Sequence, residues 1–195
     1  MSEGKIKTAL EKALERSEKF RQVSTEELKL MEYKPRGNSL AGSFLIKNTD
    51  LAAELAQVPD DIRSYVKQGI EETLLKNITL PENENAKQLS KKALAGFTYI
   101  KEDLEGLNHI IGELEYLFNY YQQAAEQAKA TVRAQLHQQF MAAKQQLEAQ
   151  YGGAVEINLE NQPEFQNELR KVMSSLNQRF EGALQQAKAK IAALK

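Results

Sequence analysis

The fold is decided by residues 97–151, FTYIKEDLEGLNHIIGELEYLFNYYQQAAEQAKATVRAQLHQQFMAAKQQLEAQY. Up to Tyr121 the large apolar residues recur at alternating steps of three and four, which is the spacing of a heptad seam. Beyond Tyr121 successive steps of four introduce an approximate eleven-residue recurrence. After Gly152-Gly153 the segment from Phe165 to Leu194 repeats this longer period.

Two helices that share a seam must supercoil in the same sense, so the matching periods predict that these two segments pack together. We expect an antiparallel helical hairpin in which Tyr151 and Phe165 flank the turn and Leu194 lies opposite Gln122. Because the seam is rich in alanine it buries little apolar area, and a second copy or a partner protein is expected to cover it. The predicted hairpin seam consists of Val132, Leu136, Phe140, Leu147, Phe165, Leu169, Leu176 and Phe180.

The first residues of the chain predict two helices. Residues 5–21 have an apolar face between alternating Lys and Glu, which is typical of an amphipathic helix. Residues 24–27, Ser-Thr-Glu-Glu, have the pattern of a capping box. The helix that they open is expected to end before Pro35, because a proline disfavours the helical conformation of the residue before it.

The segment that follows Pro35 has a different pattern. Leu40, Gly42, Phe44 and Ile46 alternate with other residues, which predicts a short strand or an ordered loop. Residues 50–57 and a longer segment that begins at Asp60 predict two further helices before Pro81. The first 80 residues are thus expected to form four short helices and one possible strand.

Residues 83–151 contain no proline, and each of their three glycines costs only about 1 kcal/mol in a helix. We expect one very long helix, with a bend at Gly96, Gly106 or Gly112 as the alternative. A last helix is expected from Pro163 to the end of the chain. The sequence therefore predicts an all-α protein with a helical body at residues 1–121 and a projecting hairpin at residues 122–195.

Composition narrows the class of protein. Of the 195 residues, 42% are hydrophobic and 27% are charged, which fits a soluble helical protein better than a disordered one. The formal net charge is −1 and the two signs are interleaved, so we expect no binding to nucleic acid or to an anionic membrane. The absence of cysteine excludes a disulfide, a thiolate nucleophile and a cysteine zinc site. The N-terminus has no apolar signal region, so a cytoplasmic location is expected.

No group of residues makes a good case for catalysis or for a cofactor. Glu105, His109 and Glu113 are spaced by four and are weak candidates for metal ligands. His109 falls opposite the seam, however, so an exposed polar stripe without a metal is the better interpretation. An aromatic cluster has no Lys or Arg within four residues, so core packing explains it better than base stacking. The cluster comprises Tyr116, Phe118, Tyr120 and Tyr121.

The predicted hairpin tip carries the strongest indication of a binding site. Val155, Ile157 and Leu159 alternate with polar residues, as in a strand with one apolar face. Because a lone strand is not stable, we expect these residues to bind a second subunit or another protein. The alternative is that the tip folds back onto its own helices.

Two short stretches carry a family resemblance. Residues 51–56, LAAELA, and residues 77–81, NITLP, are similar to a group of small helical bacterial proteins of unassigned function. The resemblance covers most of the chain and implies no active-site residues. The eleven-residue period also resembles that of the peripheral-stalk subunits of rotary ATPases, which is an analogy of mechanics.

The sequence therefore predicts a non-enzymatic structural or protein-interaction protein. It is expected to form a homo-oligomer, a dimer in the simplest case, and to bind a possible protein partner through the hairpin. One alternative is a stalk or scaffold component of a larger complex. Another is a membrane-surface protein that uses residues 5–21, although their even mixture of Lys and Glu argues against it.

Overall fold

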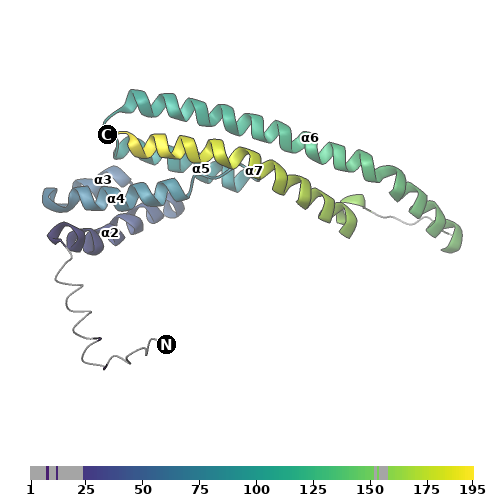
Figure 1. Ribbon diagram of the computed structural model, residues 1–195, viewed down its shortest axis with the longest axis horizontal. Helices are drawn as coiled ribbons and strands as arrows, with labels where there is room; N and C mark the ends of the chain where they lie inside the picture. The colour runs from purple at the N-terminus through teal and green to yellow at the C-terminus, as the bar shows by residue number, and fades with distance from the viewer. Residues whose placement is uncertain (1–7, 9–11, 13–23, 152, 154–157) are drawn as a thin grey trace, which may run out of the picture. The chain divides into compact units, whose positions relative to one another are not determined.

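The computed structural model describes residues 8, 12, 24–151, 153 and 158–195, and every regular element within them is helical (Figure 1). The all-α prediction is therefore confirmed for this part of the chain, while the helix predicted at residues 5–21 lies outside it except for residues 8 and 12. The chain divides into two compact units, Met1–Leu74 and Leu75–Lys195. This boundary does not coincide with the one predicted at residue 121.

Helix α2 (Thr25–Lys47) begins at the predicted capping box. The backbone N–H of Glu27 donates to the Ser24 hydroxyl at 3.2 Å, and the Ser24 N–H donates to the Glu27 carboxylate at 2.8 Å. The prediction that this helix ends before Pro35 is wrong. The helix continues to Lys47, and the next residue, Asn48, adopts the left-handed conformation that often ends helices. The prediction of a strand or loop at residues 40–46 is wrong, because these residues complete α2.

Burial on one face explains why α2 continues through its proline. Gly37, Ala41 and Leu45 are spaced by four and are all buried, whereas Ile46 is 81% exposed. This spacing places one helical face against the core, whereas the predicted strand would have buried the face that carries Phe44 and Ile46. Tertiary packing therefore outweighs the loss of one backbone hydrogen bond at Pro35.

Helices α2 and α4 (Asp60–Lys76) meet where each carries a glycine. A Cβ atom added to Gly37 would overlap the Val66 carbonyl oxygen and lie 2.9 Å from the Ile70 nitrogen. A Cβ atom added to Gly69 would overlap the Lys34 carbonyl oxygen. The two backbones therefore approach so closely that neither position has room for a side chain.

The predicted helix at residues 50–57 is confirmed as α3 (Leu51–Ala56). The Asp50 carboxylate caps it, since it accepts hydrogen bonds from the N–H groups of Ala52 and Ala53 at 3.0 and 3.2 Å. Leu51 and Leu55 are both buried, one turn apart. The helix predicted to begin at Asp60 is likewise confirmed as α4.

The second unit begins with α5 (Glu84–Gly96), η1 (Phe97–Tyr99) and α6 (Leu104–Tyr151). The prediction of one continuous helix over residues 83–151 is wrong, and the alternative of a break at Gly96 is correct, because α5 ends there and the chain turns back into α6. This turn starts at Gly96 and buries Leu94, Phe97 and Ile100. A straight helix would have left these apolar side chains without a core, so their burial favours the break.

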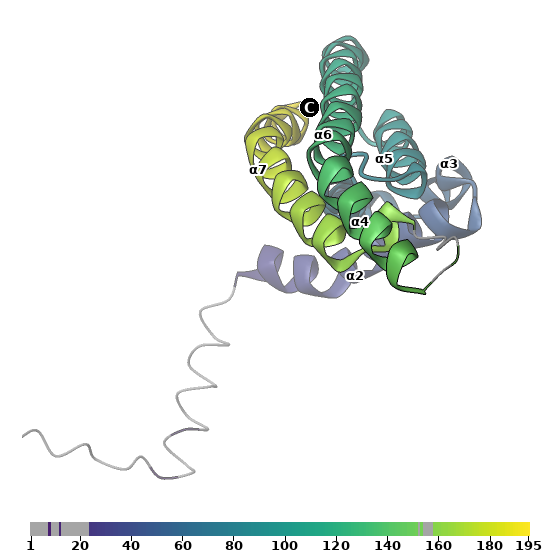
Figure 2. The ribbon, with the colours of Figure 1, turned by 90° about the vertical axis from the view of Figure 1, so that its right-hand side faces the viewer.

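Two further elements complete the unit, η2 (Leu159–Asn161) and α7 (Pro163–Ala193). The last helix thus begins at the proline that the sequence indicated. In the end-on view, α6 lies between α7 and α5 (Figure 2). The connection into α5 is held by the buried Ser90 hydroxyl, which accepts from the Thr79 N–H at 2.9 Å.

Candidate protein-interaction surface

Helix α7 runs antiparallel to α6, as predicted, but in a different register. At one end of the pair the backbone N–H groups of Glu102 and Asp103 donate to the Lys195 carbonyl oxygen at 2.7 and 3.2 Å. Farther along, Lys190 pairs with Glu113 at 2.7 Å. The C-terminal end of α7 therefore lies at the beginning of α6, and the prediction that Leu194 lies opposite Gln122 is wrong.

In the observed register, the large apolar residues of α7 pack against large residues of α6. Phe180 contacts Tyr121, with ring centroids 5.3 Å apart and nearly perpendicular planes. Leu184 and Ile191 are also fully buried, at 1% and 0% exposure. The predicted register would have set these residues against the alanine-rich half of α6, where less apolar area is available to bury.

Lys101 fixes the C-terminal end of α7. Its side chain is buried, and its ammonium donates to the carbonyl oxygens of Leu194 at 2.8 Å and Ala192 at 3.5 Å. The last carbonyl groups of a helix have no partner within the helix, and a cation at this end also opposes the helix dipole. Lys101 was not singled out from the sequence, where it looks like any other surface lysine.

Replacing Lys101 with methionine is expected to loosen the last turn of α7. The variant leaves two part-buried carbonyl oxygens without the Lys101 donor, at a cost of about 1 kcal/mol or more. Hydrogen exchange of the amides at residues 187–195 should therefore become roughly tenfold faster or more. Lys190→Met is the matched control, since it removes only an exposed ion pair worth less than about 1 kcal/mol. Equal exchange in both variants would contradict the role of Lys101.

A hydrogen-bonded chain crosses the unit halfway along α6. The Tyr121 hydroxyl donates to the Asn177 side-chain oxygen at 2.7 Å, and the Asn177 amide donates to the Glu82 carboxylate at 2.6 Å. Burial, and secondarily the charge of Glu82, raise the pKa of Tyr121 to about 12. With so high a pKa, the Tyr121 phenol is poorly suited to acid–base chemistry near neutral pH. These hydrogen bonds are better suited to holding together the three segments that carry Tyr121, Asn177 and Glu82.

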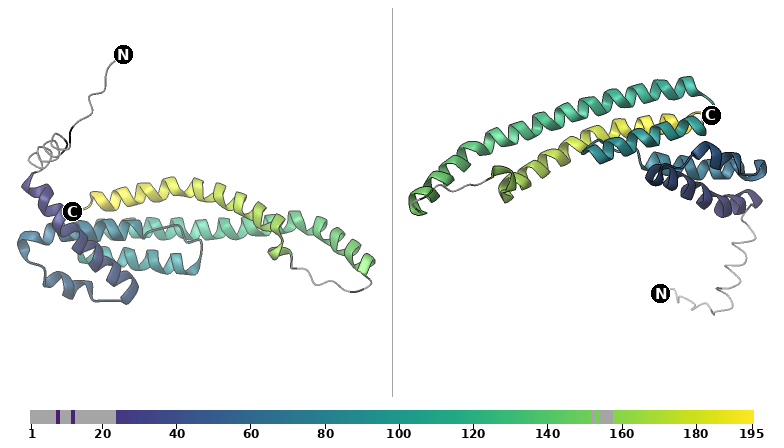
Figure 3. Two further views of the ribbon diagram at one scale, coloured as in Figure 1. Left: turned by 90° about the horizontal axis from the view of Figure 1, so that it is seen from below. Right: turned by 180° about the vertical axis from the view of Figure 1, so that it is seen from behind.

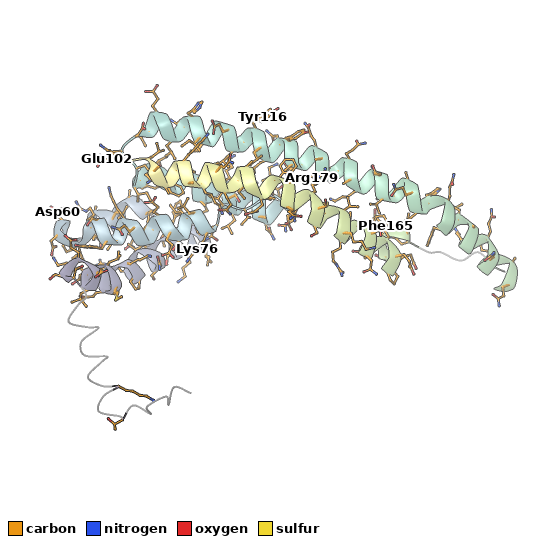
Figure 4. All side chains as sticks on the ribbon, viewed as in Figure 1. Asp60, Lys76, Glu102, Tyr116, Phe165 and Arg179 are labelled. Atoms are coloured by element: carbon orange, nitrogen blue, oxygen red, sulfur yellow. The ribbon has the colours of Figure 1, made fainter. Side chains whose placement is uncertain are left out.

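The hydrogen bonds among Tyr121, Asn177 and Glu82 also mark the level at which α5 begins. Glu82 directly precedes Asn83, the N-cap residue of α5, so α5 covers the α6–α7 pair only from this level toward Glu102. Figures 1 and 3 show α5 alongside one half of the pair only, and Figure 4 places Glu102 near one end and Phe165 near the other. We call residues 122–151 of α6 and 163–176 of α7 the distal hairpin.

Apolar side chains are less buried in the distal hairpin than in the half of the α6–α7 pair beside α5. In the covered half, Leu107 and Leu114 are both 0% exposed. Beyond Tyr121 most of the large apolar side chains remain partly exposed, and Met141 is 42% exposed. Half-buried apolar side chains thus lie on both helices of the distal hairpin, and we call them together the half-covered stripe. Its half-buried members are Leu136, Phe140, Leu169, Val172, Met173 and Leu176.

The predicted seam residues fall into two groups. Val132, Phe165 and Phe180 are buried, at 1%, 4% and 9% exposure. The side chain of Leu147 lies outside the described residues, and the remaining four belong to the half-covered stripe. The sequence did not single out Met173 as a member, although it lies four residues from Leu169.

The tip differs from the predicted strand where it is described. Leu159 opens the short helix η2, so the strand prediction is wrong at this residue. Val155 and Ile157 lie outside the described residues. Glu160, within η2, pairs with Arg133 of α6, so the chain that returns from the tip joins α6 about 18 residues before α6 ends.

The weak metal candidates are arranged as an exposed polar stripe. His109 is exposed and lies 3.4 Å from the Glu113 carboxylate, whose other oxygen binds Lys190. The hydrogen bond from Lys190 holds the pKa of Glu113 below its usual value. Because the lysine already neutralises this carboxylate, Glu113 is a poor ligand for a cation. Across the described parts of the chain, no group of three or more His, Cys, Asp or Glu side chains is placed to hold a metal ion.

The aromatic cluster of α6 is only partly core. Phe118 and Tyr121 are buried, as the packing interpretation requires. Tyr116 and Tyr120 are 75% and 58% exposed, so that interpretation is wrong for these two residues. Tyr120 still rests against Phe180 with ring centroids 5.6 Å apart.

Comparison with known proteins gives a family and no activity. A protein-family model described as a family of unknown function (DUF6657) matches residues 52–193. The chain belongs to this family. The assignment confirms the resemblance to a family of unassigned function, and DUF6657 spans nearly all of the second compact unit but only residues 52–74 of the first. Comparisons with curated proteins and with solved structures found no match. Among the helices described for this DUF6657 member, none is long and apolar enough to cross a membrane.

Proposed function

We propose that the protein is a non-catalytic structural protein that self-associates through its distal hairpin. The half-covered apolar stripe carries the proposal, because six large apolar side chains on two helices are only half-buried in the part of the α6–α7 pair that lies beyond α5. Continuous apolar patches on soluble proteins are typical of interaction sites. A cytoplasmic location, the absence of a cofactor and the absence of enzyme activity remain parts of this proposal.

The two-helix part of the distal hairpin is short. Arg133 pairs with Glu160 and Tyr121 with Asn177, so α7 lies beside α6 over only about twelve residues beyond Tyr121. At 1.5 Å per residue this length is about 18 Å. A second copy must therefore also contact the part of α6 beyond Arg133 to bury the roughly 800 Å² per partner of a standard interface.

The charges of the distal hairpin permit two copies to approach. Residues 122–151 contain nine glutamines but only three basic and two acidic residues. Several charges are also paired within one copy, including Lys129 with Glu126 and Arg133 with Glu160. Little like-charge repulsion therefore opposes self-association through this face.

Polar substitutions in the stripe are expected to dissociate the protein. The wild-type chain should elute from a sizing column with a light-scattering mass of twice 22.0 kDa. Leu136→Ser combined with Leu176→Ser removes two apolar contacts per copy and should weaken association by about two orders of magnitude or more. The measurement is the mass as a function of protein concentration, with circular dichroism to confirm that the variant is folded.

The matched control changes two leucines that lie outside the stripe. Leu28 and Leu104 are 47% and 46% exposed, so Leu28→Ser combined with Leu104→Ser removes similar side chains that do not belong to the stripe. This control should keep the wild-type mass. A separate variant with serine at Val155, Ile157 and Leu159 tests whether the tip contributes. A monomeric wild-type chain at all concentrations would refute the proposed function.

A further inference from the structure

The geometry points to a conformational link in which α7 holds in place the segment that leads from the first compact unit into the second. This connecting segment, residues 77–83, lies between the end of α4 and the start of α5, and the boundary between the units falls just before it. Asn177 of α7 is the positioning residue of the link, because its side chain binds both the connecting segment and α6. The inference does not depend on self-association, so it goes beyond the proposed function.

Helix α5 anchors the first half of the connecting segment. The buried Ser90 hydroxyl accepts from the Thr79 N–H at 2.9 Å and donates to the Thr79 carbonyl oxygen at 3.0 Å. Ile78 and Leu80 are also buried, at 0% and 5% exposure. Glu82, in the second half, is exposed, and its carboxylate is held by the Asn177 amide of α7. The two halves of the segment are therefore fixed by two different helices.

The amide of Asn177 satisfies two neighbours at once. The Tyr121 hydroxyl donates to the amide oxygen at 2.7 Å, which leaves the NH₂ group to donate to the Glu82 carboxylate at 2.6 Å. A carboxylate accepts hydrogen bonds and cannot donate them, so this end needs a donor. Tyr121 is 0% exposed and packs against Phe180, so the core of the unit sets the orientation of the amide. A displacement of α7 at this level therefore breaks the hydrogen bond that holds Glu82.

The link adjoins the half-covered stripe. Leu176, a member of the stripe, directly precedes Asn177 on α7. A change in the packing of α7 at Leu176 therefore acts one residue away from the contact with the connecting segment. Because a coupling free energy is reciprocal, release of the segment should also loosen α7 at this level.

Asn177→Asp tests the link with almost no change in shape. The new carboxylate still accepts from Tyr121, but it has no proton to donate to Glu82 and repels it. Hydrogen exchange of the amides at residues 79–83 in the full chain should become roughly tenfold faster or more, the effect of losing a hydrogen bond to a charged group. Gln178→Glu is the matched control, since it adds the same charge at the neighbouring, exposed residue. This control should leave the exchange unchanged.

A second substitution should restore the contact. When Asn177→Asp is combined with Glu82→Gln, the glutamine amide can donate to the new carboxylate, so exchange should return toward the wild-type rate. Such a recovery distinguishes a specific contact from a general loss of stability. Phe180→Leu, which alters the packing of α7 on Tyr121, should speed exchange at residues 79–83 in the wild type but add nothing in Asn177→Asp. Additive effects of these two substitutions would contradict the link.

Three further results would overturn the inference. They are unchanged exchange at residues 79–83 in Asn177→Asp, equal effects of Asn177→Asp and Gln178→Glu, and no recovery when Glu82→Gln is added. The proposed function is judged separately, by the dependence of the mass on the half-covered stripe. A monomeric chain that shows the expected exchange pattern would refute self-association and support the link.

Discussion

Replacing Gly37 with alanine is expected to destabilise the first unit by about 3 kcal/mol, the upper part of the range for overpacked cores. The new methyl group would overlap the Val66 carbonyl oxygen of α4 and lie 2.9 Å from the Ile70 nitrogen. These are backbone atoms, so no side-chain rotation relieves the contact and the two helices must separate. Hydrogen–deuterium exchange should show faster exchange across both α2 and α4.

A second glycine of α2 provides the control for this prediction. Gly42 has no atom within 4 Å of the place where a Cβ would stand. Gly42→Ala should therefore stabilise α2 by up to about 1 kcal/mol, because alanine is the better helix former. Opposite signs at two glycines of one helix would locate the effect in the crossing with α4. Similar effects at Gly37 and Gly42 would show that the close approach is not important for stability.

Replacing Tyr121 with alanine is expected to cost the second unit about 4 kcal/mol, as for other large aromatic residues in cores. Tyr121 is 0% exposed, packs against Phe180 and donates to Asn177. The substitution would leave a cavity where α6, α7 and the residues before α5 meet. Urea unfolding monitored by circular dichroism measures the loss. A loss below about 1 kcal/mol would mean that this contact is not central to the fold.

Comparison of the wild type with Tyr121→Phe isolates the hydroxyl group and its pH dependence. Below pH 10 the wild type should be more stable by about 1 kcal/mol, the value of a typical hydrogen bond. The pKa of Tyr121 is raised from 10.0 to about 12 in the folded chain, so its contribution is complete below pH 10 and is lost as the pH rises to 12. The difference between wild type and variant should fall by about 2–3 kcal/mol across this window. A constant difference would contradict the shifted pKa.

Features of the fold that depend on local pattern were predictable from the sequence. Asp50 before an apolar pattern predicted α3, and Pro163 in the first turn predicted α7. The capping box at Ser24 also predicted where α2 begins. Each of these signals is completed by atoms within a few residues, so no knowledge of the tertiary structure is needed to interpret it.

Errors arose where distant packing decides between local alternatives. Pro35 disfavours a helix locally, but the crossing of Gly37 with α4 depends on residues about 30 positions away. The turn after Gly96 depends in the same way on burying Leu94 and Phe97. The register of α7 depends on comparing two seams, and matching periods alone do not distinguish one pairing from another shifted along it.

The candidate site was predictable only in outline. The periods of α6 and α7 identified seam positions such as Leu136 and Leu176, but they did not indicate that these positions would be half covered. These positions lie beyond α5, which is a separate helix because of the turn at Gly96, a turn that the sequence offered only as an alternative. The role of Asn177 was also not predicted, because it depends on hydrogen bonds with Tyr121 and Glu82, each more than 50 residues away.

The spacing of the contacts between α6 and α7 restricts how the hairpin can move. Lys101, Glu113, Tyr121 and Arg133 bind successive parts of the returning chain. A slip of one helical turn, about 5.4 Å, would break all of these contacts together, so shear between the two helices is opposed along their shared length. The two helices are therefore expected to bend or rotate together, because sliding of one along the other is opposed.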